Sequence, residues 1–67
     1  MTSEMRSNIN KLFEMVNNKE ITAYRVAKEA GMSQIQISNL INKKSSIDNI
    51  SFSNAESLSE VYLELRK

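Results

Sequence analysis

Amide, hydroxyl and amino side chains gather in residues 33–44, in the stretch SQIQISNLINKK. Such groups recognise a partner through hydrogen bonds and charge. Groups that make and break covalent bonds are scarce, because the chain has no histidine and no cysteine and its carboxylates are scattered. A single glycine also leaves no glycine-rich loop for a phosphate. We therefore expect no enzyme, no bound metal, no cofactor and no small-molecule ligand.

Length and charge limit the organisation of the chain. Its 67 residues, with a formal net charge of +1, predict one domain spanning residues 1–67. From residue 34 to residue 47 the only charged side chains are Lys43 and Lys44, whereas four acids follow from residue 48 onward. Random scatter in a short sequence explains that bias equally well. No long apolar run and no signal peptide are present, so we expect a cytoplasmic protein without a membrane span, beginning at its natural methionine.

The elements that must position these side chains are helices. The chain has no proline and 40% apolar residues, and its apolar spacing follows the helical period almost throughout. A first helix, with Ser3 as its N-cap, is predicted to end in the stretch NNKE at 17–20, where asparagine competes with helix. Apolar residues four, three and four positions apart form its inner face: Met5, Ile9, Leu12 and Val16.

Two short helices follow, with a tight turn between them. Thr22 is expected to cap the first and Gly31 to end it, because glycine takes the left-handed conformation with little steric penalty. Ser33 opens the second, where Gln36 completes the spacing of a capping box, and Asn42 is expected to end it in the left-handed conformation. The inward stripe of this helix is Ile37, Leu40 and Ile41. Two short helices around a glycine turn have the arrangement of a helix-turn-helix.

The remaining residues predict a polar connection and further helix. Ile47 is expected to anchor the connection, and the pattern from Ile50 to Leu65 is helical, as one helix or as two, with Ser59 its weakest point. The sequence thus predicts an all-α fold, a compact bundle of four or five helices with the helix-turn-helix at about residues 22–42. Residues 59–67 form a candidate dimerisation tail, because they hold more apolar side chains than one helix face needs: Val61, Tyr62, Leu63 and Leu65.

The two short helices also carry a recognisable order of residues. A small residue is followed by glycine four positions later, and aliphatic residues lie six and nine positions beyond that glycine. The residues concerned are Thr22, Val26, Ala27, Ala30, Gly31, Met32, Ser33, Ile37 and Leu40. This order resembles the lambda-repressor and Cro-like (XRE-type) helix-turn-helix DNA-binding family, specifically over residues 21–44 and more loosely over 5–65. The chain departs from that family where Ala23 replaces a common glutamine, Ile41 a common glutamate and Lys43 a common glycine.

The resemblance implies a sequence-specific DNA-binding transcriptional regulator, a Cro-like repressor or switch protein that binds a double-stranded DNA operator as a homodimer. The helix that follows Ser33 would read base edges in the major groove. The implied base-reading residues are Gln34, Ile35, Ser38 and Asn39. The implied phosphate contacts are Thr22, Ser33, Gln36, Asn42, Lys43 and Lys44. Glutamine and asparagine suit adenine and isoleucine suits a thymine methyl group, which favours an A/T-containing site.

Plainer roles remain open for several of these side chains. Gln34 can be a solvated residue of a first helical turn, and Ile35 can pack on a neighbouring helix. Arg25 is expected to pair with Glu29 rather than to contact DNA. Tyr24 can either reach a phosphate or cover the junction between the first two helices.

The alternative function is a small helical protein-interaction module, such as an antirepressor or an antitoxin-like partner. The low net charge and Ala23 favour it. It predicts that Lys43 and Lys44 are dispensable and that the apolar residues of the tail carry the activity.

Overall fold

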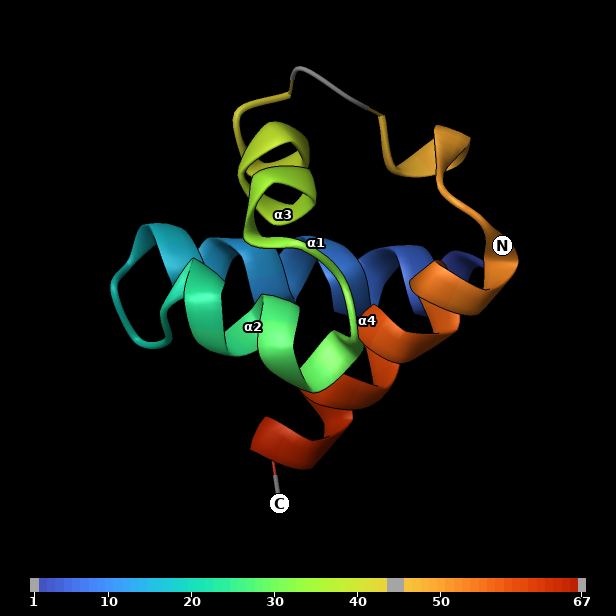
Figure 1. The fold of residues 1–67 in the computed structure, drawn as a ribbon. Helices are drawn as coiled ribbons and strands as arrows, with labels where there is room; N and C mark the ends of the chain where they lie inside the picture. The colour runs from blue at the N-terminus through green and yellow to red at the C-terminus, as the bar shows by residue number, and fades with distance from the viewer. Residues whose placement is uncertain (1, 44–45, 67) are drawn as a thin grey trace.

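A computed structural model describes residues 2–43 and 46–66, and over this part of the chain it contains four α-helices, one short 3-10 helix and no strand. The helices are α1 (Ser3–Asn17), α2 (Ala23–Ala30), α3 (Gln34–Ile41) and α4 (Phe52–Leu65), and the 3-10 helix η1 (Ile47–Asn49) lies between α3 and α4 (Figure 1). The predicted all-α fold is confirmed. The continuous α4 decides between the one or two helices that the sequence allowed. None of these helices is long and apolar enough to cross a membrane.

The starts of α2 and α3 follow the predicted caps. Thr22 Oγ1 accepts a hydrogen bond from the backbone N–H of Arg25 at 3.1 Å. Ser33 Oγ accepts one from the N–H of Gln36 at 3.1 Å, and Gln36 Oε1 accepts one from the N–H of Ser33 at 3.1 Å. Ser33 and Gln36 thus form a complete capping box, which satisfies two backbone donors that a helix start leaves without partners.

The predicted cap of α1 is wrong by one residue. Thr2, not Ser3, lies in the extended conformation, and Thr2 Oγ1 accepts the N–H of Met5 at 3.1 Å. Ser3 is already the first helical residue. Both residue types make good N-caps, so only the conformation of the chain distinguishes them.

The ends of α2 and α3 differ in the residue that takes the left-handed conformation. Gly31 ends α2 with φ of 71°, as predicted. The prediction for Asn42 is wrong, because its φ is −82° and its N–H still closes the last turn on the carbonyl of Ser38 at 2.9 Å. The left-handed residue is the next one, Lys43, with φ of 61°. A lysine therefore occupies a backbone conformation that favours glycine.

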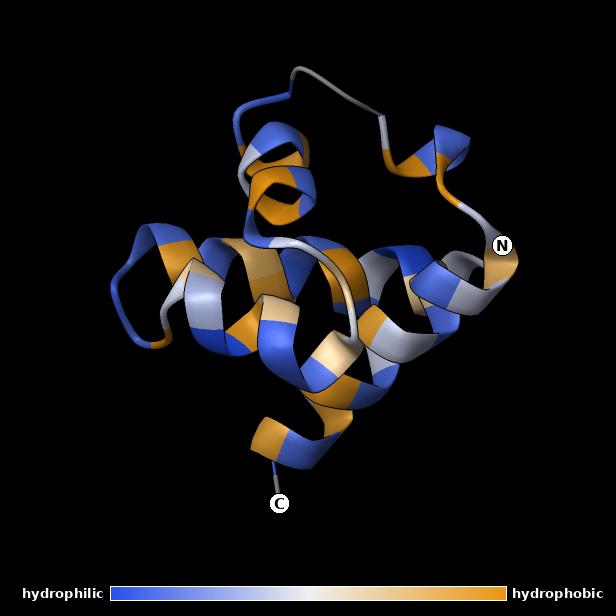
Figure 2. Ribbon diagram, in the orientation of Figure 1, coloured by the Kyte–Doolittle hydropathy of each residue, from blue (hydrophilic) through white to orange (hydrophobic). Residues whose placement is uncertain are grey.

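The core draws on all four α-helices, and hydrophobic positions recur along each of them (Figure 2). α1 packs mainly on α4, while α2 packs on both α3 and α4. The largest fully buried side chains are Ile9, Leu12, Val26, Ile37 and Leu58. Burying each such side chain contributes about 1.5–3 kcal/mol relative to exposure. Ile41, predicted to face inward with Ile37 and Leu40, is half-buried and packs on the edge of this core.

A buried hydrogen bond joins α1 to α4. Asn8 Nδ2 donates to Ser59 Oγ at 3.0 Å, across 51 residues of sequence. Ser59, which the sequence suggested as the weakest point of the last helix, is buried at this contact. The serine therefore belongs to the packing between the two longest helices.

Candidate nucleic-acid interface

The helix α3 is held on one side only. Residues 31–33 join it to α2, and in Figure 1 it is seen nearly end-on above α1. Ile37 and Leu40 fix it to the core, with 0% and 5% of their surfaces exposed. The opposite side of the helix is left open to solvent.

The open side begins at the first turn of α3. Gln34, Ile35 and Gln36 are exposed, whereas Ser38 and Asn39 are half-buried at the edges. The exposed fraction of Ile35 is 74%, so it does not pack on a neighbouring helix. Of the four predicted base-reading residues, the structure thus presents Gln34 and Ile35 openly and Ser38 and Asn39 in part.

Three of the predicted phosphate contacts lie at helix starts and are engaged in capping. The hydroxyl oxygens of Thr22 and Ser33 accept backbone N–H groups, and the Ser33 hydroxyl in turn donates to Gln36 Oε1 at 3.4 Å, so the Thr22 hydroxyl hydrogen is the one left to donate to a partner. Gln36 Oε1 accepts from Ser33, so the Nε2 amide of Gln36 keeps its two donors for a partner. Donors at a helix start suit an anion, because the positive end of the helix dipole lies there.

The other predicted phosphate contacts follow the end of α3. Asn42 and Lys43 are both exposed. Lys44 lies outside the residues that the structure describes. The left-handed backbone at Lys43 turns the chain away from the helix, toward η1.

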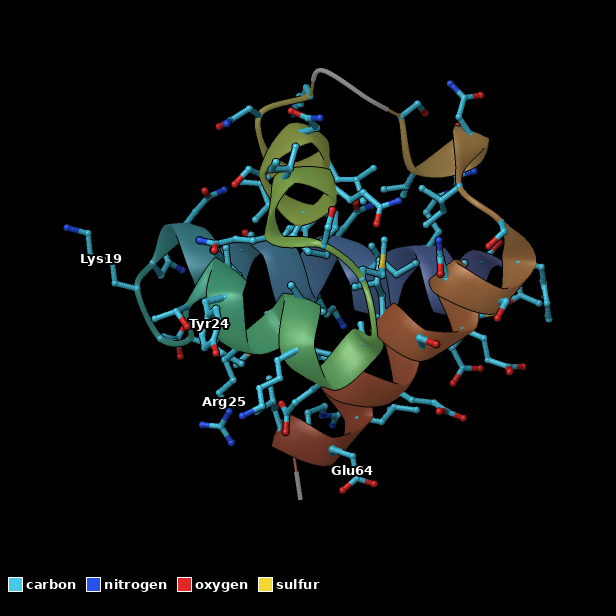
Figure 3. All side chains as sticks on the ribbon, in the orientation of Figure 1. Lys19, Tyr24, Arg25 and Glu64 are labelled. Atoms are coloured by element: carbon cyan, nitrogen blue, oxygen red, sulfur yellow. The ribbon has the colours of Figure 1, made fainter. Side chains whose placement is uncertain are left out.

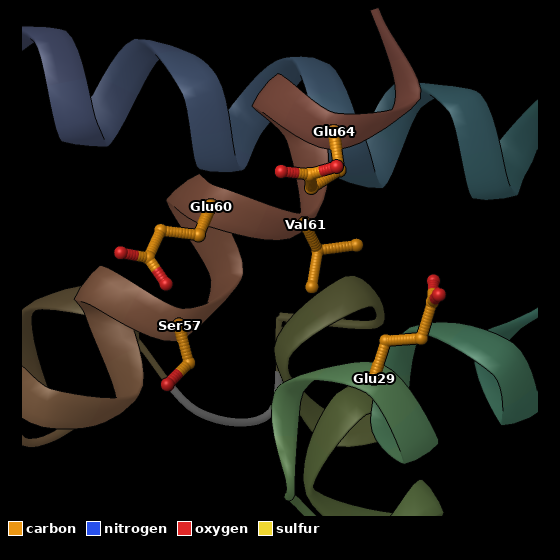
Figure 4. Close-up of a pocket in the computed structure, with 5 residues that line it drawn as sticks. All are labelled: Glu29, Ser57, Glu60, Val61 and Glu64. Atoms are coloured by element: carbon orange, nitrogen blue, oxygen red, sulfur yellow. The ribbon is translucent and has the colours of Figure 1, made fainter. Parts of the chain in front are cut away.

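The acidic residues of the chain are unevenly distributed. No acidic residue occurs from residue 30 to residue 47, a range that includes all of α3. By contrast, Glu29 of α2 and Glu60 and Glu64 of α4 line a common pocket, together with Ser57 and Val61 (Figure 4). Glu29 is paired with Arg25, so it is the acids of α4 that disfavour a polyanion at this pocket, whereas α3 contributes no carboxylate.

The first turn of α2 and the connection before it carry further exposed side chains, labelled in Figure 3. Arg25 Nε lies 3.5 Å from Glu29 Oε2, which confirms the predicted pair. Tyr24 is 62% exposed, so most of its side chain is open to solvent. Lys19, in the α1–α2 connection, is an exposed cation that sequence reasoning did not single out. Its position directly after the asparagine pair that ends α1 is the only sequence signal for it.

Fewer residues of the candidate dimerisation tail are exposed than the sequence suggested. Val61 is 6% exposed and belongs to the core of its own protomer, so it is not available to a second copy. The buried positions of α4 are residues 55, 58, 59 and 61, so Val61 faces the core. Tyr62 and Leu65 are half-buried, and the Arg66 guanidinium lies 5.7 Å from the centroid of the Tyr62 ring. Leu63 alone of the four is exposed, at 41%.

Comparison of this chain with models of protein families, with curated proteins and with solved structures gives no match. The function is therefore argued from the geometry and charge of the chain itself. Within the described residues, no group of three or more histidine, cysteine, aspartate or glutamate side chains is placed to hold a metal.

Proposed function

We propose that this chain is a sequence-specific DNA-binding regulator, in which α2 and α3 form a helix-turn-helix and α3 enters the major groove. The observation that carries the proposal is the open side of α3, where Gln34 and Ile35 are exposed and no acid lies nearby in sequence. A helix with its side chains is about 10–12 Å wide, and the major groove is about 12 Å wide. The resemblance to lambda-repressor and Cro-like proteins adds to this reading.

The chemistry of the open side suits A·T base pairs. The side-chain amide of Gln34 can bond adenine at N6 and N7, and Asn39 offers the same pair of groups one turn later. Ile35 has little apolar contact in the protein, and a thymine methyl group would bury it. Since the first turn of a recognition helix lies closest to the bases, Gln34 and Ile35 are the principal readers.

Phosphate contacts would surround this helix. Thr22 supplies a hydroxyl donor at the start of α2, and Gln36 supplies an amide at the start of α3. Ser33 would have to release its hydrogen bond to Gln36 before it could donate to a phosphate. Asn42 and Lys43 supply the groups beyond the end of α3. Lys44 would join them. With few cations and a net charge of +1, one copy binds weakly and its affinity falls steeply with salt.

A second copy would supply the missing affinity. The largest extent of the molecule is 26 Å, shorter than the spacing of about 34 Å between successive half-sites on one face of DNA. One copy therefore covers one half-site, and the exposed Leu63 is the contact we assign to a dimer. Such a dimer in the cytoplasm would repress transcription by covering a promoter, without acting as an enzyme.

A second candidate function is favoured by one observation, the number of large apolar side chains at the surface. They are Tyr24, Ile35, Phe52 and Leu63. Protein partners commonly bury such residues. On this reading Ile35 meets a protein rather than a thymine, and DNA affinity is absent.

The proposal is tested by selecting bound duplexes from a random pool of DNA. We expect enrichment of A/T-containing sites, and Gln34→Ala should relax the preference at one position by about 1–3 kcal/mol. The matched control is Asn10→Ala, which removes an exposed amide from α1. A pool that shows no enrichment with the native chain contradicts the proposal and favours the protein-interaction module.

A further inference from the structure

An ion pair joins the beginning of α1 to the connection between α3 and α4. The Arg6 guanidinium donates a hydrogen bond to Asp48 Oδ1, across 42 residues of sequence. Through this bond Arg6 holds the pKa of the Asp48 carboxyl below its ordinary value, while Asp48 raises the pKa of Arg6. Both side chains are about half exposed, with 45% and 56% of their surfaces open to solvent.

Asp48 lies in a segment that is otherwise held by local contacts. Ser46 Oγ accepts the N–H of Asp48 at 3.1 Å, and the carbonyl of Ser46 accepts the N–H of Asn49 at 3.0 Å. Ile47 and Ile50 are half-buried against the core. One pocket between α1, the end of α3 and this segment has Arg6, Glu14, Lys43 and Ser46 in its lining. The ion pair therefore ties the described residues 46–50 to α1.

We propose that Arg6 and Asp48 are positioning residues for the DNA interface: their ion pair fastens the α3–α4 connection to α1 and so holds Lys43 where it meets a DNA phosphate. The inference rests on the proposed function. Pairing with Arg6 also offsets the negative charge of the Asp48 carboxylate, which would otherwise repel the DNA backbone. Neither residue needs to touch DNA for this role.

Two single variants distinguish a positioning role of the ion pair from an effect of net charge on DNA binding. Arg6→Gln lowers the net charge of the chain by one and Asp48→Asn raises it by one. Charge alone therefore predicts weaker DNA binding for the first and tighter binding for the second. Positioning predicts that both weaken binding to a selected duplex, by about two- to fivefold, the range of an exposed ion pair. The exchange Arg6→Asp with Asp48→Arg restores the pair and should restore the affinity.

A double-mutant cycle tests whether the pair acts through Lys43. In a Lys43→Gln background, Asp48→Asn should no longer weaken binding, because the contact that it positions is already gone and its charge effect favours binding. Tighter binding by Asp48→Asn alone, failure of the exchange to restore affinity, or full additivity of Asp48→Asn with Lys43→Gln would each overturn the inference.

A readout without DNA keeps this inference distinct from the proposed function. Amide hydrogen exchange at Asn49, whose N–H is bonded to Ser46, should quicken in both single variants and recover in the exchange variant. If the native chain binds no DNA, the proposed function fails, and exchange at Asn49 still reports whether the pair fastens the connection. Unchanged exchange in both single variants overturns the fastening itself.

Discussion

Among the described residues, Lys19, Gly31 and Lys43 have left-handed backbone, a conformation that is strained for a residue with a Cβ. A Cβ added at Gly31 would meet no heavy atom within 4 Å, so this glycine is needed for its φ of 71° and not for space. Lys43 has nearly the same φ, 61°, and accepts the strain of a side chain there. The lysine is the costlier choice for the backbone, which fits a side chain retained for its charge.

Replacing Lys43 by glycine and Gly31 by alanine should therefore change the stability of the chain in opposite directions. Lys43→Gly is expected to raise the free energy of unfolding by about 0.5–1 kcal/mol, and Gly31→Ala to lower it by about 1 kcal/mol. Urea denaturation measures both. On the proposed function, Lys43→Gly also weakens DNA binding despite the added stability, as does Lys43→Gln, which keeps the strain. Lower stability in Lys43→Gly would contradict the argument.

Asp48 gives the stability of the chain a predictable pH dependence. Its pKa is lowered in the folded state, first by the hydrogen bond from Arg6, so its contribution is present above the ordinary pKa of aspartate. That contribution is lost as the pH falls through the folded pKa, below about pH 4. The stability difference between the native chain and Asp48→Asn should be constant from about pH 5 to 7 and shrink below that range. A difference that grows on acidification would contradict the assigned sign.

Among the elements, α1 and α4 depend on a polar contact at their centre. Asn8 and Ser59 satisfy one another in a buried site, and no buried side-chain nitrogen or oxygen of the described residues lacks a partner. Ser59→Ala leaves the Asn8 amide without that partner and should lower the free energy of unfolding by about 1–3 kcal/mol. The control is Ser57→Ala, on the same helix but only half-buried, which should change little. Equal losses in the two variants would show that the hydrogen bond is not the cause.

Local rules were sufficient to predict most helix boundaries. The caps at Thr22 and Ser33, the glycine end of α2 and the break after α1 all follow from residues within four positions of each other. Where two good caps were adjacent, as at Thr2 and Ser3, the sequence did not distinguish them. The shift of the left-handed residue from Asn42 to Lys43 is a miss of the same kind, by a single position.

The packing of α4 was less predictable, because it depends on contacts far apart in sequence. Assigning Val61 to a dimer surface was wrong since α4 turns that residue toward the core. The pairs Asn8–Ser59 and Arg6–Asp48 were missed, as each needs the relative position of two elements that no local pattern supplies. The open side of α3 was predicted well in its first turn, and Ser38 and Asn39 proved less exposed than Gln34 and Ile35.

At the scale of the molecule, the acidic side chains are unevenly distributed along the chain. The α2–α4 side carries Glu29, Glu60 and Glu64, while the range from residue 30 to residue 47 carries no acid. A nearly neutral chain can therefore still orient itself on a polyanion. This distribution is the reason that the proposal rests on α3 and not on net charge.

The most direct test is an anisotropy titration of a selected duplex at physiological salt, comparing the native chain with Gln34→Glu and Ser3→Glu. Each variant adds one negative charge at the first position of an exposed helix start, where an acid stabilises the helix, so loss of binding cannot reflect unfolding. Charges farther apart than about 8 Å are largely screened under these conditions. We expect salt-sensitive binding by the native chain, at least tenfold weaker binding by Gln34→Glu and a change below twofold for Ser3→Glu, since losing one bidentate base contact is worth about 1–3 kcal/mol. No binding by the native chain even at low salt, or equal losses in both variants, would contradict α3 as the reader of DNA.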